Sequence, residues 1–154
     1  MNRRTRHKAL VWIVRPAARS PLREGPDAPE VLLLERPETR GGGLHPVTGK
    51  ANRGERPEAA AEREVREETG FAGELRDLGF HHEFVAARPG KKETRWVEHA
   101  WLLSVPAGSA PQLSDEHVAA RWVPAPDAAA VLEWAAHRET LALALAAWSA
   151  LRGA

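Results

Sequence analysis

Three glutamates between residues 49 and 71, in the stretch GKANRGERPEAAAEREVREETGF, have a spacing that suits metal-ion chemistry. A helix advances about 100° per residue, so Glu64, Glu67 and Glu68 fall within roughly a 100° wedge that is one turn deep. Hard divalent cations take several carboxylate oxygens, and Mg²⁺ often completes its shell with water and substrate phosphates. The wedge, beside a glycine-rich loop, therefore fits a divalent-cation site.

An ordinary solvated helix is the alternative interpretation of the same residues. Glu62 and Arg66 form an i,i+4 pair of opposite charge, which stabilises a helix by about 0.3 kcal/mol. Glu64 and Glu68 form an i,i+4 pair of like charge, which costs a similar amount. From the spacing alone, both interpretations stay open.

The elements that position this segment follow from the hydrophobic pattern. The acidic helix is expected to begin near Pro57, where a missing N–H costs nothing, and to end at Gly70, a favoured residue after the last helical turn. Short apolar or β-branched runs predict five strands and one brief extended piece: 8–15, 30–36, 75–86, 96–105 and 119–124, with the brief piece near 45–48. From Pro126 onward the sequence predicts two helices, or one helix broken near His137.

Strands before and after one central helix, followed by C-terminal helices, predict an α+β fold, with an αβα sandwich around a mixed sheet. We find no internal repeat and no interdomain linker, so a single domain over residues 1–154 is expected. The arginine-rich start, MNRRTRHK, is expected to be a frayed, solvated terminus.

Composition excludes several classes of protein. The chain has 154 residues, a formal net charge of +1 and no cysteine, so disulfides, thiolate zinc sites and cysteine nucleophiles are absent. The balanced charge offers no broad basic field for a long polyanion, and no stable nucleic-acid complex is expected. The apolar runs are too short to cross a bilayer. A cytoplasmic protein, either a monomer or a homodimer, is expected. A small phosphorylated ligand as its partner remains possible, because a local cluster of cations suffices to bind one.

The acidic segment resembles the Nudix box, written G-x5-E-x7-R-E-U-x-E-E-x-G-U, in which U is a bulky apolar residue. All nine defined positions are filled without a gap: Gly49, Glu55, Arg63, Glu64, Val65, Glu67, Glu68, Gly70 and Phe71. The predicted fold also resembles the Nudix αβα sandwich, so the resemblance covers nearly the whole chain.

The Nudix resemblance implies an enzyme that uses Mg²⁺, with Mn²⁺ as the alternative ion, to cleave a diphosphate linked to a further group. By that resemblance, Glu64, Glu67 and Glu68 hold the metal, and Glu55 is an extra ligand or a simple loop acid. Arg63 is expected to orient and neutralise the neighbouring glutamates. The glycines are expected to shape the backbone.

Weaker features resemble one Nudix subgroup, the bacterial dihydroneopterin triphosphate pyrophosphatases. The chain has VTG where many relatives have PGG, which puts a MutT-like sanitising role in doubt, and it has DEH ahead of A-x-x-W. This resemblance implies that Glu116 is a metal ligand or base. It also implies that Lys8, Arg36 and Thr48 line the substrate site; strand-end charges that reach water are the alternative for the two cations.

Other functions remain open from the sequence. A dinucleoside polyphosphate or another nucleoside diphosphate derivative is an alternative substrate, and a non-catalytic Nudix-fold domain that binds a regulatory ligand is an alternative of a different class. The basic loop RPGKKETR is interpreted as a solvated hairpin, with phosphate binding as the alternative. Trp96 and Trp101 are expected in the core, with stacking on a substrate ring as the alternative.

Overall fold

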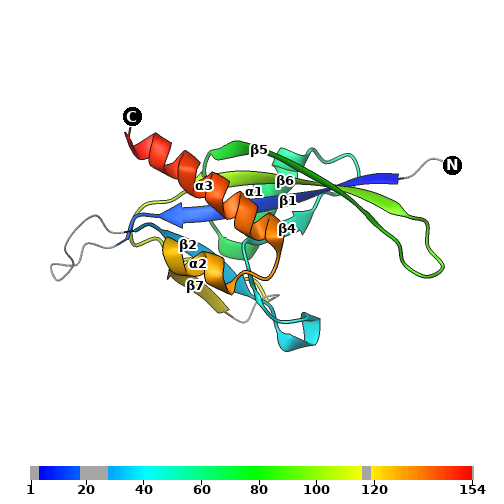
Figure 1. Ribbon diagram of the computed structural model, residues 1–154, viewed down its shortest axis with the longest axis horizontal. Helices are drawn as coiled ribbons and strands as arrows, with labels where there is room; N and C mark the ends of the chain where they lie inside the picture. Colours follow the sequence, from blue (N-terminus) through cyan, green and yellow to red (C-terminus); the bar gives the residue numbers. More distant parts are fainter. Residues whose placement is uncertain (1–3, 18–27, 116–118, 154) are drawn as a thin grey trace.

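The computed structural model describes residues 4–17, 28–115 and 119–153 (Figure 1). Within these residues, strands form one mixed sheet with the order β3-β2-β1-β6-β5, in which β4 also pairs with β1, and β7 with β2. The strands are β1 Arg4–Arg15, β2 Glu30–Glu35, β3 Leu44–His45, β4 Val47–Lys50, β5 Leu75–Ala86, β6 Thr94–Ser104 and β7 Ala119–Pro124. The helices are η1 Glu38–Arg40 (a 3-10 turn), α1 Pro57–Thr69, α2 Ala125–Val131 and α3 Ala135–Gly153.

Strand β1 is the centre of the sheet. It pairs in parallel with β6 from Arg4 to Val14, and antiparallel with β4 and β2 at different points along its length. Its apolar run from Ala9 to Val14 is at most 2% exposed. A strand that is buried on both faces has apolar residues at successive positions, which explains why apolar and polar residues do not alternate in this segment.

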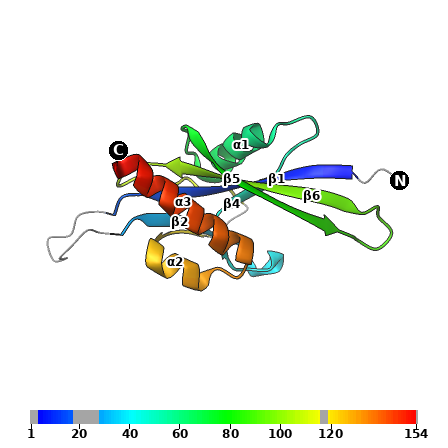
Figure 2. The same ribbon diagram turned by 45° about the horizontal axis from the view of Figure 1, so that its top comes forward.

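Two apolar cores lie on opposite faces of the sheet because successive strand residues point to opposite sides. Helix α1 packs through Ala61 and Val65 against a core that includes Val11 of β1. Helices α2 and α3 pack against the other core, which includes Trp12 of β1 and Leu141 of α3. Figure 2 shows α1 on one side of the sheet and α2 and α3 on the other. The predicted α+β sandwich is confirmed.

The acidic helix has the ends that the sequence predicts. Pro57 occupies the first turn of α1, and Gly70 follows the last turn with φ 76°, a left-handed conformation that favours glycine. The backbone N–H of Gly70 donates to the carbonyl of Arg66 at 2.9 Å, which closes the helix.

The predicted frayed start is wrong for the described residues, because β1 begins at Arg4 instead of Lys8. Arg4 and Arg6 are in register with Thr94 and Trp96 of β6. The β5–β6 hairpin extends beyond the helices beside this end of β1 (Figure 1) and supplies its backbone partners. The prediction of a hairpin around the Pro-Gly turn is confirmed.

The C-terminal segment forms two helices, and the break lies at residues 132–134 instead of near His137. Leu132 has an extended backbone and is 4% exposed, so burying this side chain interrupts the helix. Trp134 follows in the connection and is 65% exposed. A search of the described residues finds no helix of the length and apolarity that crossing a membrane requires.

Candidate active site

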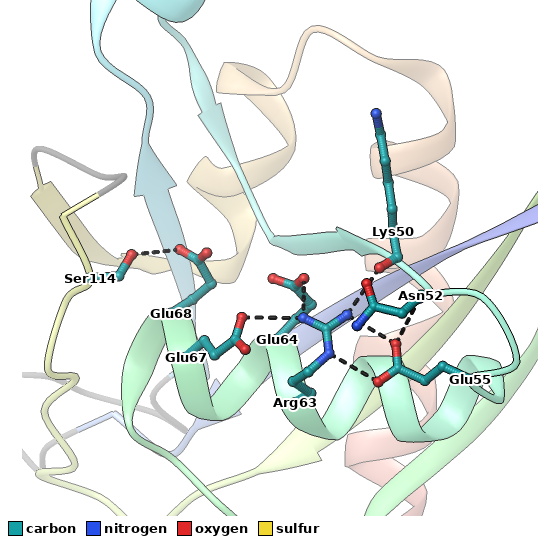
Figure 3. A network of polar contacts seen from close by, with 8 residues as sticks. All are labelled: Lys50, Asn52, Glu55, Arg63, Glu64, Glu67, Glu68 and Ser114. Atoms are coloured by element: carbon teal, nitrogen blue, oxygen red, sulfur yellow. Dashed lines mark hydrogen bonds and ion pairs between the residues drawn. The ribbon is translucent and has the colours of Figure 1, made fainter.

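Arg63 is the centre of a polar network on α1 (Figure 3). Its Nε and Nη2 donate to the two oxygens of Glu55 at 2.9 and 3.0 Å. Its Nη1 donates to Glu64 at 2.9 Å and to Glu67 at 3.2 Å, and Nη2 also donates to the carbonyl of Lys50 at 3.0 Å. A guanidinium has five N–H donors, and all five are engaged here. The predicted role of Arg63, to orient and neutralise its neighbours, agrees with this arrangement.

Glu55 fixes the loop that precedes α1. It accepts the backbone N–H of Asn52 at 2.9 Å in addition to its two bonds from Arg63. These hydrogen bonds, first those from Arg63, hold the pKa of Glu55 below its ordinary value. With its carboxylate committed in this way, Glu55 serves the network as an anchor for Arg63.

Gly49 allows β4 to lie directly against Glu64. A Cβ at position 49 would lie 2.2 Å from the Cγ and Cδ of Glu64 and 2.5 Å from its Oε1. Real side chains do not approach so closely, so only glycine at this position leaves Glu64 where it is. The carboxylate of Glu64 is thereby held beside the backbone of β4.

The three wedge glutamates differ in environment. The side chain of Glu64 is 14% exposed and that of Glu67 is 56% exposed, whereas Glu68 as a whole residue is 4% exposed. Burial raises the pKa of Glu64, and the pull of Arg63 opposes this only in part. The carboxylates of Glu67 and Glu68 raise it further. The repulsion anticipated from the sequence is therefore present in the fold.

Glu68 is held by a loop that the sequence does not connect with it. Ser114 Oγ donates to Glu68 Oε2 at 3.2 Å, and the backbone N–H of Gln112 donates to the carbonyl of Thr69 at 2.8 Å. The segment 112–114 thus covers the end of α1. Glu116, the predicted ligand or base, lies outside the described residues.

The donor types of this helix fit a hard divalent cation. As placed, no three acidic or histidine side chains of the described residues converge on one point that an ion would occupy. The reason is visible in Figure 3: Glu64 and Glu67 turn toward Arg63, and Glu68 turns toward Ser114. Arg63 engages one oxygen of Glu64 and one of Glu67, and a divalent ion commonly binds a single carboxylate oxygen.

A cavity of about 620 Å³ brings together the three predicted substrate residues, Lys8, Arg36 and Thr48. Gly49 also lines this cavity, so the carboxylate of Glu64 lies directly behind its wall. Arg36 Nη2 donates to Thr48 Oγ1 at 3.4 Å. The acidic helix and the cationic cavity therefore meet at β4, where strand and helix are in contact.

Lys8 is a crowded cation within this cavity. Burial is the main cause that lowers the pKa of Lys8, and the nearby charges of Lys50, Arg36 and Arg88 lower it further. Glu98, which also lines the cavity, acts in the opposite direction. An anion in the cavity would relieve the repulsion among these cations.

Trp134 and His137 are among the cavity residues that the sequence did not mark as site candidates. Trp134 lines the cavity although most of its surface is exposed, and His137 lines it from the first turn of α3. His137 is 9% exposed, and among the described residues its Nδ1 has no hydrogen-bond partner. Burial first, and then the charge of Arg36, lowers the pKa of His137 to about 4.

Of the two tryptophans considered from the sequence, Trp101 belongs to the core behind α1. Trp96 is 7% exposed, with three cations placed over its ring. The basic hairpin divides into two parts: Arg95 pairs with Glu83, whereas Arg88, Lys91 and Lys92 line a second cavity.

Comparisons of the sequence and of the fold with known proteins point to the same family. A family model for the NUDIX domain matches residues 14–144. The dihydroneopterin triphosphate pyrophosphohydrolase of E. coli is 26% identical, with a TM-score of 0.67 over 88% of this chain and 91% of that chain. An Ap4A hydrolase of C. elegans, in a binary complex, is 24% identical, with a TM-score of 0.68 over 96% of this chain and 98% of that chain.

An octanoyltransferase of Myxococcus xanthus is 38% identical over 125 residues, which are 79% of this chain and 34% of that protein. The chain spans about a third of the length of this curated relative. The name octanoyltransferase refers to that longer protein as a whole. The family model extends from β1 into α3, and the solved structures share the fold over most of the chain. The chain therefore belongs to the Nudix family of hydrolases, which act on diphosphate bonds.

Proposed function

We propose that this domain hydrolyses a nucleoside or pterin triphosphate, such as dihydroneopterin triphosphate, to a monophosphate and pyrophosphate. The observation that carries the proposal is the position of Gly49, which lines the cavity together with Lys8, Arg36 and Thr48 and also lies against the side chain of Glu64. The similarity to the E. coli dihydroneopterin triphosphate pyrophosphohydrolase, at 26% identity, supports this substrate class.

Nudix hydrolases generally use divalent metal ions, and we propose Mg²⁺ held by Glu64, Glu67 and Glu68, with Glu116 as a further ligand or the base. Bound there, the ion would supply positive charge to the phosphate oxygens and lower the pKa of the attacking water. Arg63 would keep Glu64 in place, since its Nη1 donates a hydrogen bond to the carboxylate of Glu64.

The cations of the cavity would hold the triphosphate. Lys8 and Arg36 offer N–H donors to its oxygens, and the hydroxyl of Thr48 offers another. Water attacks one phosphorus, the bond from that phosphorus to the bridging oxygen breaks, and pyrophosphate leaves while a carboxylate takes the proton of the water. The fixed positive charges favour this step because negative charge grows on the leaving oxygen.

Trp134 and His137 support a substrate with a flat, hydrogen-bonding headgroup. An exposed tryptophan on a cavity wall offers a face on which a base or pterin ring stacks. The unpartnered Nδ1 of His137 leaves a buried polar atom that a ligand would satisfy. An inorganic phosphate chain has no ring to stack on Trp134.

The test is a release assay across nucleoside triphosphates, dihydroneopterin triphosphate and dinucleoside polyphosphates, with Mg²⁺ present. Glu68→Gln is expected to lower kcat/KM by about two orders of magnitude, since it removes a charged group from the reacting centre. Glu62→Gln, an exposed change on the same helix, is the matched control and should keep the wild-type rate.

Each outcome of this assay has a definite meaning. If the wild type releases nothing from the whole panel but binds one of these ligands, the domain is a regulatory binding module and the enzyme proposal fails. If Glu68→Gln is as active as the wild type, the assignment of the metal site fails. A clear preference for dinucleoside polyphosphates would overturn the triphosphate assignment alone.

A further inference from the structure

A second cavity, of about 440 Å³, lies between the N-terminal end of β1 and the β5–β6 hairpin. We call it the basic cleft. Its described lining residues include seven cations and no acidic residue: Arg4, Arg6, Lys8, Lys50, Arg88, Lys91 and Lys92. The whole chain carries a formal charge of only +1, so this concentration of positive charge is local. The proposed function uses only Lys8 of this set.

Trp96 forms part of the lining of the basic cleft, and three of the cations of the cleft lie over its ring. Arg6 lies 4.8 Å, Lys8 5.1 Å and Lys50 5.4 Å from the centre of the tryptophan ring. The π face of a tryptophan attracts cations without using up their N–H donors in conventional hydrogen bonds, as a carboxylate would. These cations are thus positioned by an aromatic ring, and their donors are kept for a ligand.

The cations also repel one another. Lys50 and Arg88, both from the basic cleft, add to the burial that disfavours the charged form of Lys8. Clustering like charges around a partly buried lysine costs folding free energy, as it does for the glutamates of α1. An anion would offset this cost, and several phosphate oxygens would use several cations at once.

The basic cleft adjoins the substrate cavity. Lys8, Lys50 and Phe84 line both of them. A phosphate chain that starts beside Gly49 would therefore pass Lys8 and Lys50 and enter the basic cleft, while the headgroup stays near Trp134. The two cavities together offer room for a ligand that is longer than a nucleoside diphosphate.

We propose that the basic cleft binds the phosphates on the far side of the bond that is cut, so that it selects substrates by the length of their phosphate chain. This inference rests on the proposed function, because it extends the same site. The ligand is the terminal part of a nucleoside or pterin polyphosphate, and free pyrophosphate or tripolyphosphate would bind there as a fragment of it.

The first experiment is a calorimetric titration of the protein with inorganic tripolyphosphate, with EDTA present so that no divalent ion takes part. The test variant is Lys91→Ala/Lys92→Ala, which removes two exposed cations from the hairpin. The matched control is Arg66→Ala/Arg76→Ala, which removes two exposed cations that do not line the basic cleft. We expect the test variant to weaken binding by roughly tenfold and the control to leave it within about twofold.

The second experiment compares the hydrolysis of a nucleoside di-, tri- and tetraphosphate with one common base. In the wild type, KM should fall as phosphates are added. In Lys91→Ala/Lys92→Ala this dependence should flatten, with the smallest change for the diphosphate and the largest for the tetraphosphate. Equal tripolyphosphate binding by the test variant and the wild type would overturn the inference, as would an equal rise of KM for all three substrates. The absence of hydrolysis by the wild type would instead refute the proposed function, and the titration would still decide on the basic cleft.

Discussion

Gly49→Ala should lower the activity of this protein and leave its stability nearly unchanged. The added Cβ would lie 2.2 Å from Glu64, whereas ordinary contact begins at 3.4 Å, so the glutamate must retreat by about 1.2 Å. A misplacement of about 1 Å in a catalytic group costs on the order of 100-fold in rate. We therefore expect kcat/KM to fall about 100-fold, because the carboxylate proposed to hold the metal moves.

The stability of the same variant should change little. Gly49 lies within strand β4 and is not among the described glycines with positive φ, so alanine fits its backbone. Replacing such a glycine stabilises a protein by about 0.4–1 kcal/mol through the unfolded chain, which offsets the cost of turning a flexible side chain. The expected Tm is within a few degrees of the wild type, measured by thermal unfolding alongside the release assay.

Gly73→Ala is the matched control for this prediction. Its Cβ would lie 2.9 Å from Leu103, which is 1% exposed and part of the core. Overpacking of this kind costs about 1–3 kcal/mol, so this variant should lose stability and keep kcat/KM at temperatures where it is folded. Wild-type activity in Gly49→Ala would refute the reasoning, because the position of Glu64 against β4 would then have no bearing on the reaction.

Three further predictions follow from the site. Trp134→Ala should raise KM for a nucleoside triphosphate about tenfold, as expected for a lost stacking contact, while Val131→Ala, also exposed but not lining the cavity, should not. The pKa of His137 is lowered from 6.5 to about 4 in the folded protein, so its contribution to stability is complete above pH 6.5 and is lost as the pH falls toward 4. Urea unfolding should show that the free energy of unfolding falls by about 3 kcal/mol over this pH range, and His137→Gln should abolish this pH dependence. Mg²⁺ at about 100 times its Kd should stabilise the wild type by about 2.7 kcal/mol in thermal unfolding, and an equal gain in Glu68→Gln would contradict the metal assignment.

The local parts of the structure were predictable from the sequence. Helix α1 was predicted with its ends at Pro57 and Gly70 because both signals are local: a proline in the first turn and a glycine after the last. The wedge of glutamates was likewise predictable, since their spacing along one helix determines which face they share.

The parts that depend on distant partners were not predictable. Arg4 and Arg6 have no strand pattern of their own, and they become strand residues because the β5–β6 hairpin extends beside them. The bond between Glu68 and Ser114 joins residues 46 positions apart, and no motif connects them. The position of Trp134 follows from the burial of Leu132, which is a property of the packed core.

The roles of the metal-binding and substrate-binding residues stay predictions. The structure gathers Lys8, Arg36 and Thr48 at one cavity and places Glu64 behind its wall at Gly49, but the contribution of each residue to catalysis is a matter for the variants above. Glu116, in particular, is assigned by family resemblance alone.

The parallel pairing of β1 with β6 has a consequence for how the chain acquires its structure. Each β1 residue from Arg4 to Val14 is in register with a residue ninety positions later. Loop closure over such a span has to be complete before these contacts contribute, and proteins rich in distant contacts fold slowly. During synthesis, β1 can pair with β2 and β4 first, but its pairing along the rest of its length must wait for β6 to emerge from the ribosome. Arg4 and Arg15 lie at the two ends of this strand. Charged residues that flank an exposed apolar segment oppose its aggregation with other chains before folding is complete.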